Sequence, residues 1–262
     1  MSDHSSQKPD QNGPLGSIRV LVTRPSRESD SLVEKLEFLG ASPISHPMIT
    51  FSQAPDQDHL RDVFQRISEF SILAFLSRQA AVAFEQQCDE PPKSMPPIAA
   101  IGTGTQSCLQ QQGLKVQFLA KESNSESIAD LLIEQFRLLG SAKPILILRA
   151  NRGSHVLPAA LTAAEIPFEE LVVYSSEDVA SADPEVLQDV ASGKFQWLTI
   201  TSSSIAHNVA KLFGDHLGTT KIVSISPTTS QAAIESGLSV AAEATEYNMD
   251  GLVDAIVRYE ES

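Results

Sequence analysis

Short apolar runs and segments of helical periodicity alternate along the chain from Ile18 onward. The helical segments, such as SLVEKLEFLG and LVDAIVRYEES, carry apolar residues three and four positions apart. The runs, which read as buried strands, cover residues 18–22, 71–76, 98–101, 144–148, 197–201 and 221–225. Strand and helix in alternation predict an α/β fold, in which helices cover both faces of parallel sheets.

The first seventeen residues break this pattern. Residues 1–17 (MSDHSSQKPDQNGPLGS) contain only Met1 and Leu15 as sizeable apolar groups. So few apolar side chains cannot offset the entropy that the chain loses when it is ordered. The sequence therefore predicts a disordered tail over residues 1–17 and a folded chain after it.

The folded part contains an internal repeat. Residues 100–113 (AIGTGTQSCLQQQG) pair with residues 224–237 (SISPTTSQAAIESG), and three further segments pair in the same order. Equivalent positions lie 124 or 125 residues apart and include Arg24 with Arg149, Ile49 with Tyr174, Ser77 with Ser202, and Thr105 with Thr229. The repeat predicts two copies of one α/β unit of about 120 residues, which is a usual domain size.

In each copy, three polar turns follow predicted strands: an arginine turn, a serine turn and a threonine turn. Ligands of parallel α/β sheets bind beyond the carboxyl ends of the strands, where helices begin. We therefore expect the turns of each copy to share one edge, and two such edges to line a cleft for a small molecule. Serine and threonine are also the preferred helix N-caps, so capping alone is the competing explanation.

Composition excludes several classes of protein. Among 262 residues, 42% are hydrophobic and 20% charged, and the formal net charge is −14, which disfavours nucleic-acid binding. No apolar run is long enough for a membrane span and no signal peptide is evident, so we expect a cytoplasmic protein. Cys88 and Cys108 are the only cysteines and have no ligand spacing around them; we expect neither a disulfide nor a metal site.

Motifs along almost the whole chain together resemble the uroporphyrinogen-III synthase family. They include VLVTRP, LSRQAAVAF, IAAIGTGTQSCLQQQG, ILILRANRGSHVLPAAL, VVYSS, TITSSSIAHNV and MDGLVDAI. The resemblance implies two similar α/β domains around a substrate cleft, joined by a two-stranded connection over residues 41–51 and 166–176. It assigns residues 18–47 with 176–262 to a discontinuous domain 1, and residues 48–175 to an inserted domain 2.

The resemblance also implies the chemistry. The family closes hydroxymethylbilane to uroporphyrinogen III, inverting ring D and losing water, without cofactor or metal. Tyr174 matches the family's VVY tyrosine, the catalytic candidate for helping the hydroxyl depart. The substrate-binding candidates are Ser77, Arg78, Thr105, Ser202, Ser203, Thr229, Arg24 and Arg149. We expect a monomer that touches no nucleic acid or membrane and meets hydroxymethylbilane synthase only transiently.

Two other functions fit parts of the sequence. The segment TSSSI after a strand is similar to the phosphate loops of sugar isomerase domains, which would make the protein a phosphosugar-binding isomerase. Two α/β lobes around a cleft also describe a non-enzymatic bilobal small-molecule-binding protein. An isomerase would need a catalytic Glu or His beside the serine loop, and a receptor would carry an export signal or a DNA-binding headpiece; neither feature is evident.

Overall fold

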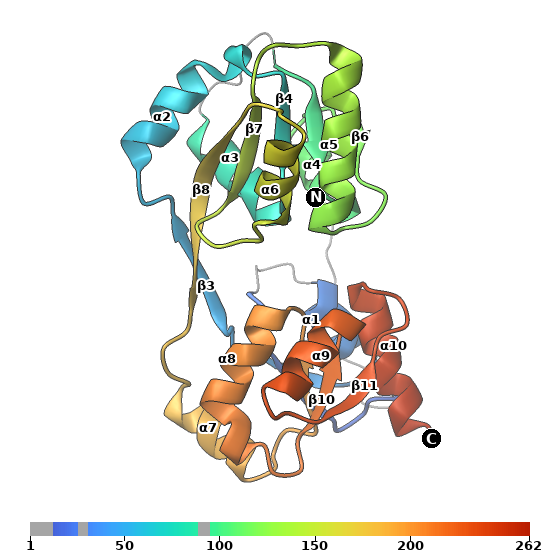
Figure 1. Ribbon diagram of the computed structural model, residues 1–262. Coiled ribbons are helices and arrows are strands. Elements are labelled where there is room, and N and C mark those ends of the chain that lie inside the picture. The colour runs from blue at the N-terminus through green and yellow to red at the C-terminus, as the bar shows by residue number, and fades with distance from the viewer. Residues whose placement is uncertain (1–12, 26–30, 89–94) are drawn as a thin grey trace, which may run out of the picture. The chain divides into compact units, whose positions relative to one another are not determined.

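The computed structural model describes residues 13–25, 31–88 and 95–262. The described residues divide into two compact units (Figure 1). The first unit joins the described part of Met1–Thr50 to Glu177–Ser262, and the second is formed by the described part of Phe51–Ser176. The chain thus enters the second unit once and returns from it once.

The first unit is built on a parallel sheet of five strands in the order β11-β10-β9-β1-β2. The strands are β1 (Arg19–Val22), β2 (Ser42–Ser45), β9 (Trp197–Ile200), β10 (Lys221–Ser224) and β11 (Val240–Glu243). The helices are α1 (Ser31–Phe38), α7 (Pro184–Ala191), α8 (Ser203–Phe213), α9 (Pro227–Glu235) and α10 (Met249–Glu260), with a 3-10 turn at Gly214–His216.

Helices cover both faces of this sheet. Side chains alternate along each strand, so neighbouring residues pack against different helices. Val20 and Val22 of β1 join a buried cluster with residues of α1 and α10. Leu21, between them, joins a different cluster with residues of α7, α8 and α9. A sheet buried on both sides accounts for the continuous apolar runs in the sequence.

The second unit holds a six-stranded sheet in the order β3-β8-β7-β4-β5-β6. Its strands are β3 (Ile49–Gln53), β4 (Ile72–Phe75), β5 (Ile98–Ala100), β6 (Phe118–Leu119), β7 (Ile145–Ala150) and β8 (Phe168–Asp178). Its helices are α2 (Gln57–Gln65), α3 (Arg78–Gln87), α4 (Thr103–Gln111), α5 (Ser125–Leu139) and α6 (Val156–Ala163), with a 3-10 turn at Ile67–Glu69. The pairs from β8 through β6 are parallel.

Both faces of the second sheet are again covered. Leu73 and Phe75 of β4 are buried together with residues of α2, α3 and α4. Ile72 and Ala74 are buried with residues of α5 and α6. The predicted α/β class with covered parallel sheets is confirmed, and each of the six predicted runs overlaps a strand.

The predicted tail needs a correction. Residues 1–12 lie outside the described part of the chain, but residues 13–17 do not. Leu15 is fully buried among residues of α1 and α10, and its N–H donates to the Leu39 carbonyl at 3.0 Å. Its apolar side chain therefore stabilises the first unit, and the part of the prediction that covered residues 13–17 is wrong.

The segments that connect the units are anchored inside the first unit by Asn208. This α8 side chain is 2% exposed, and its Nδ2 donates to the carbonyls of Met48 (2.7 Å) and Val179 (3.1 Å). The Val179 N–H also donates to the Met48 carbonyl, at 3.0 Å. One buried amide thus holds the chain on its way into β3 and on its way out of β8.

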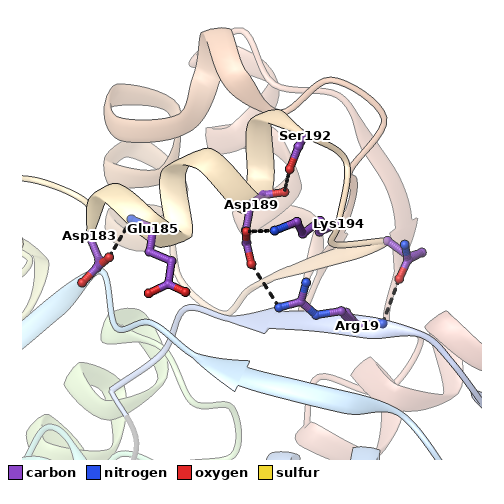
Figure 2. Close-up of polar contacts among 7 residues, drawn as sticks. Arg19, Asp183, Glu185, Asp189, Ser192 and Lys194 are labelled. Carbon is purple, nitrogen blue, oxygen red and sulfur yellow. Dashed lines mark hydrogen bonds and ion pairs between the residues drawn. The ribbon is translucent and has the colours of Figure 1, made fainter.

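Asp189 of α7 links this helix to β1 and to the turn before β9. Figure 2 shows its carboxylate between two cations: Arg19 Nη2 lies 3.2 Å from Oδ2, and Lys194 Nζ lies 2.6 Å from Oδ1. The Arg19 guanidinium also lies 4.6 Å from the centroid of the Phe195 ring. The hydrogen bond from Lys194, followed by that from Arg19, holds the pKa of Asp189 below its ordinary value.

We predict that Asp189→Asn lowers the melting temperature at neutral pH but not in acid. A carboxyl whose pKa is lower in the folded state stabilises the fold above its unfolded pKa of about 3.9, and that stabilisation is lost as the pH falls through the lower, folded pKa. Thermal unfolding at neutral pH, and again at a pH below the folded pKa of Asp189, measures the difference in melting temperature between wild type and Asp189→Asn. Asp58→Asn, at an exposed ion pair, is the control. A gap between wild type and Asp189→Asn that persists in acid would contradict the assignment.

Candidate functional site

Tyr174 reaches its position through an irregularity in the pairing of β7 with β8. Arg149 pairs with Val172, but the next residue, Ala150, pairs with Tyr174, so Val173 is an extra residue in β8. Successive strand residues normally face opposite sides of a sheet, and a bulge changes that alternation. Val173 and Tyr174 accordingly lie in the same buried cluster, on the side of the sheet that α3 covers.

The Tyr174 hydroxyl meets the start of α3. Its Oη lies 3.1 Å from Ser77 Oγ, and its ring packs edge to face on Phe51, with centroids 5.4 Å apart. The residue is 8% exposed. Burial raises the pKa of the Tyr174 phenol, and the hydrogen bond with Ser77 acts in the opposite direction. The phenol therefore keeps its proton at neutral pH and is available as a hydrogen-bond donor.

A pocket of about 250 Å³ lies beside the Tyr174 ring within the second unit. It is lined by Phe51, Ser52, Gln53, Gln79, Ala83, Gln86, Gln87, Val173 and Tyr174. Among the residues that the structure describes, its lining has no ionisable group except the tyrosine and is rich in glutamine amides. Gln87 also supports the site, since its Nε2 donates to the Val173 carbonyl at 2.9 Å.

Ser77 and Ser202 cap helices at equivalent places in the two units. Ser77 Oγ accepts the Ala80 N–H of α3 at 3.0 Å, and Ser202 Oγ accepts the Ile205 N–H of α8 at 3.3 Å. Ser203 is the first residue of α8. Capping, the competing explanation, is therefore the structural role of Ser77 and Ser202, and a contact of any of the three serines with a ligand remains a prediction.

The two threonines of the repeat are nearly buried. Thr105 in α4 is 4% exposed, and Thr229 in α9 is 3% exposed. Thr229 Oγ1 lies 3.1 Å from Ser226 Oγ, and Ser226 in turn accepts the Thr229 N–H at 3.4 Å. The Thr229 hydroxyl is thus part of its own helix cap, and binding of a substrate carboxylate by either threonine stays a prediction.

The three candidate arginines differ in their surroundings. Arg149 on β7 is paired with Glu170 of the neighbouring strand, and only 11% of its side chain is exposed. Arg78 is the exposed first residue of α3, directly after Ser77. Arg24 follows β1 in the first unit and is partly exposed. Of the three, Arg78 is the one adjacent in sequence to Ser77, the residue that meets the Tyr174 hydroxyl.

The structure thus brings Ser77, Arg78 and Tyr174 to one edge of the second unit. Arg24, Ser202, Ser203 and Thr229 belong to the first unit. The sequence prediction missed Phe51 and the glutamines of the pocket. A signal exists only for the glutamines of α3, because pocket residues 79, 83, 86 and 87 have the spacing of one helix face.

Within residues 13–25, 31–88 and 95–262, no group of three or more His, Cys, Asp and Glu could hold a metal ion. No helix in the same part of the chain is both long and apolar enough to span a membrane.

The chain is similar to proteins of one family. The family model described as uroporphyrinogen-III synthase HemD matches residues 30–254. A porphyrin biosynthesis protein HemD of Ruminiclostridium josui is 25% identical over 93% of this chain, which spans 49% of that relative's length. A uroporphyrinogen-III synthase of Synechococcus elongatus is 26% identical over 94% of this chain and 97% of its own.

A solved structure supports the fold. Uroporphyrinogen-III synthetase from Helicobacter pylori superposes with a TM-score of 0.61 at 18% identity, covering 92% of this chain and 99% of that one. The class that fold and site define is an α/β protein of two repeated units, with polar side chains at the carboxyl ends of parallel strands. Within that class, the chain belongs to the uroporphyrinogen-III synthase family, whose enzymes are lyases of heme biosynthesis.

We predict that Tyr174 ionises above pH 10.0, the ordinary value for a phenol, because burial disfavours the phenolate. The chain has three tyrosines, so the tyrosinate absorbance of the wild type minus that of Tyr174→Phe isolates this group. Circular dichroism at each pH checks that the protein is still folded. A difference titration with its midpoint at or below the ordinary value would contradict the buried position of the phenol.

Proposed function

We propose that this protein is a uroporphyrinogen-III synthase, which cyclises hydroxymethylbilane to uroporphyrinogen III with inversion of ring D and loss of water. The observation that carries the proposal is the family match over residues 30–254, which spans the second unit with Tyr174 and much of the first unit. The same match favours this reaction over a phosphosugar isomerase and over a non-enzymatic binding protein.

Tyr174 is the group proposed to assist departure of the hydroxyl. Its buried phenol is protonated at neutral pH and donates to the leaving oxygen. The C–O bond then breaks, water leaves, and the electron-rich pyrrole becomes an azafulvene that closes the ring through a spiro intermediate. A phenol is a weak acid, so the protein contributes chiefly by holding the chain of pyrroles in a reactive conformation.

The substrate's carboxylates need local donors because the protein carries a formal net charge of −14. In the second unit we propose Arg78, Thr105, Arg149 and the main chain at Ser77; in the first, Arg24, Ser202, Ser203 and Thr229. Support comes from the helix starts, where unpaired main-chain N–H groups and the helix dipole favour anions. Arg78 fits best, since its exposed guanidinium stands on the first turn of α3.

The finer parts of the proposal concern partners and location. We propose a cytoplasmic monomer that works without a cofactor and meets hydroxymethylbilane synthase transiently to receive its unstable product. The acidic composition supports the absence of nucleic acid among its partners.

The test of the reaction is a coupled assay with hydroxymethylbilane, followed by oxidation and separation of the uroporphyrin isomers. The type III isomer is the expected product. Exclusive formation of the symmetric type I isomer, which arises without an enzyme, would refute the proposed function. Heat-denatured protein supplies the uncatalysed background.

We predict that Tyr174→Phe lowers kcat about 100-fold, at the low end of the usual range for loss of a general acid because a phenol is a weak acid, while KM changes less than about twofold. Phenylalanine keeps the ring against Phe51 and removes only the hydroxyl. Tyr259→Phe, on the last turn of α10, is the matched control and keeps full turnover. Equal rates for Tyr174→Phe and wild type would remove Tyr174 from the mechanism.

A further inference from the structure

Ser77 and Ser202 are equivalent in the repeat, yet only one of them meets a tyrosine. Their backbones are alike, with φ and ψ of −165° and 158° at Ser77 and −162° and 160° at Ser202. Both accept a main-chain N–H three residues on.

Ser202 makes its other contact with Ser204 Oγ at 3.1 Å, whereas Ser77 meets Tyr174 Oη. The repeat position of Tyr174 holds Ile49, which has no hydroxyl. Helix capping therefore explains what the two serines share and leaves the tyrosine contact unexplained.

The Ser77 and Tyr174 hydroxyls each have one hydrogen to donate. A serine hydroxyl has one hydrogen and two acceptor sites, and the Ala80 N–H occupies one of the acceptor sites of Ser77. If Tyr174 donated to the other site, its hydrogen would be directed into the protein. If Ser77 donates to Tyr174, the tyrosine hydrogen is free to point at a ligand. The second arrangement is the one that suits a tyrosine acting as an acid.

We propose that Ser77 is a positioning residue that donates its hydroxyl hydrogen to Tyr174 Oη and thereby directs the tyrosine hydrogen to the departing hydroxyl of the substrate. The inference rests on the proposed function of Tyr174. In this arrangement the Ala80 N–H donates to Ser77 Oγ, and the Ser77 hydroxyl donates to Tyr174 Oη. The N-terminal end of α3 and the Ala80 N–H polarise Ser77, which makes it a better donor.

The bond between Ser77 and Tyr174 strengthens during the reaction. As the C–O bond of the substrate breaks, its electron pair stays on the oxygen, which takes the Tyr174 proton and leaves as water. The pyrrole nitrogen lone pair forms the new double bond, and the pyrrole N–H proton then restores the phenol. In the interval Tyr174 is a phenolate in a largely buried position, where a hydrogen-bond donor stabilises it most.

The experiment compares Ser77→Ala, Ser77→Thr and Tyr174→Phe with the double variant Ser77→Ala/Tyr174→Phe. We expect Ser77→Ala to lower kcat about 10- to 100-fold, the usual effect of losing one hydrogen bond to a charged group, with KM within about twofold. Ser77→Thr, which keeps a hydroxyl, restores most of the rate. In the Tyr174→Phe background the Ser77→Ala change has no further effect on kcat.

A second measurement reports on the contact without activity. Because Ser77 donates to the phenolate, its removal raises the pKa of Tyr174 further, and the tyrosinate difference titration moves to higher pH in Ser77→Ala. Ser77→Gly repeats both measurements in case Ser77→Ala folds poorly, since glycine is tolerated at a helix N-cap. Asp56→Ala is the matched control: it removes the cap of α2 in the same unit, where Asp56 accepts the His59 N–H at 2.9 Å. This control keeps the wild-type kcat and titration.

Four results would overturn the inference, and three of them are kinetic: an unchanged kcat in Ser77→Ala, an equal loss of kcat with and without the Tyr174 hydroxyl, or an effect confined to KM, which would mark the Ser77 hydroxyl as a substrate contact. An unchanged Tyr174 titration in Ser77→Ala also overturns it. Failure of the proposed function looks different, because Tyr174→Phe would then keep full turnover, or the wild type would form only the type I isomer, whatever the titration shows.

Discussion

Parallel pairing is the constraint on which the rest of this structure depends. Parallel strands must be joined by crossover helices, and their carboxyl ends meet at one edge of the sheet, where those helices begin. Each helix start leaves main-chain N–H groups without an internal partner. Ser77, Ser202 and Ser226 each accept one of these N–H groups through the side chain. The hydroxyl-rich turns of the sequence are therefore first a requirement of the fold, and a ligand that needs donors finds them at that edge.

Duplication of the fold did not duplicate the chemistry. Both units keep a capping serine after an equivalent strand, at Ser77 and Ser202. The position that holds Tyr174 in β8 holds Ile49 in β3, and Ile49 is buried as an ordinary apolar residue. The tyrosine, its serine partner and the glutamine-lined pocket lie in one unit alone. The repeat therefore identifies what the fold requires, and the departures from the repeat identify the candidates for function.

The elements that could be predicted from the sequence are those buried on both faces. Strands such as β4 and β7 are continuous apolar runs because helices pack on each side of them. The strands missed as separate elements lie at or beside sheet edges, where exposure removes that signal: β2, β6 and β11 have polar, exposed or very short sequences. Leu15 falls in the predicted tail because one apolar residue makes no pattern, although a single buried leucine suffices to anchor a short turn. Tyr174 could be selected by resemblance, but its direction could not, since the bulge at Val173 depends on the register between two strands.

The position of Tyr174 is determined within a single unit. Gln87 of α3 holds the main chain of β8 at the Val173 carbonyl, Phe51 packs on the tyrosine ring, and Ser77 meets the hydroxyl. These three contacts and the bulge all come from residues 51–176. The first unit fixes the same chain elsewhere, through Asn208 at Met48 and Val179. Because the two sets of anchors share no residue, a change in the segments between them leaves the geometry of Ser77 and Tyr174 intact. The proposed acid and its positioning residue therefore act as one preassembled pair, to which the substrate must be brought.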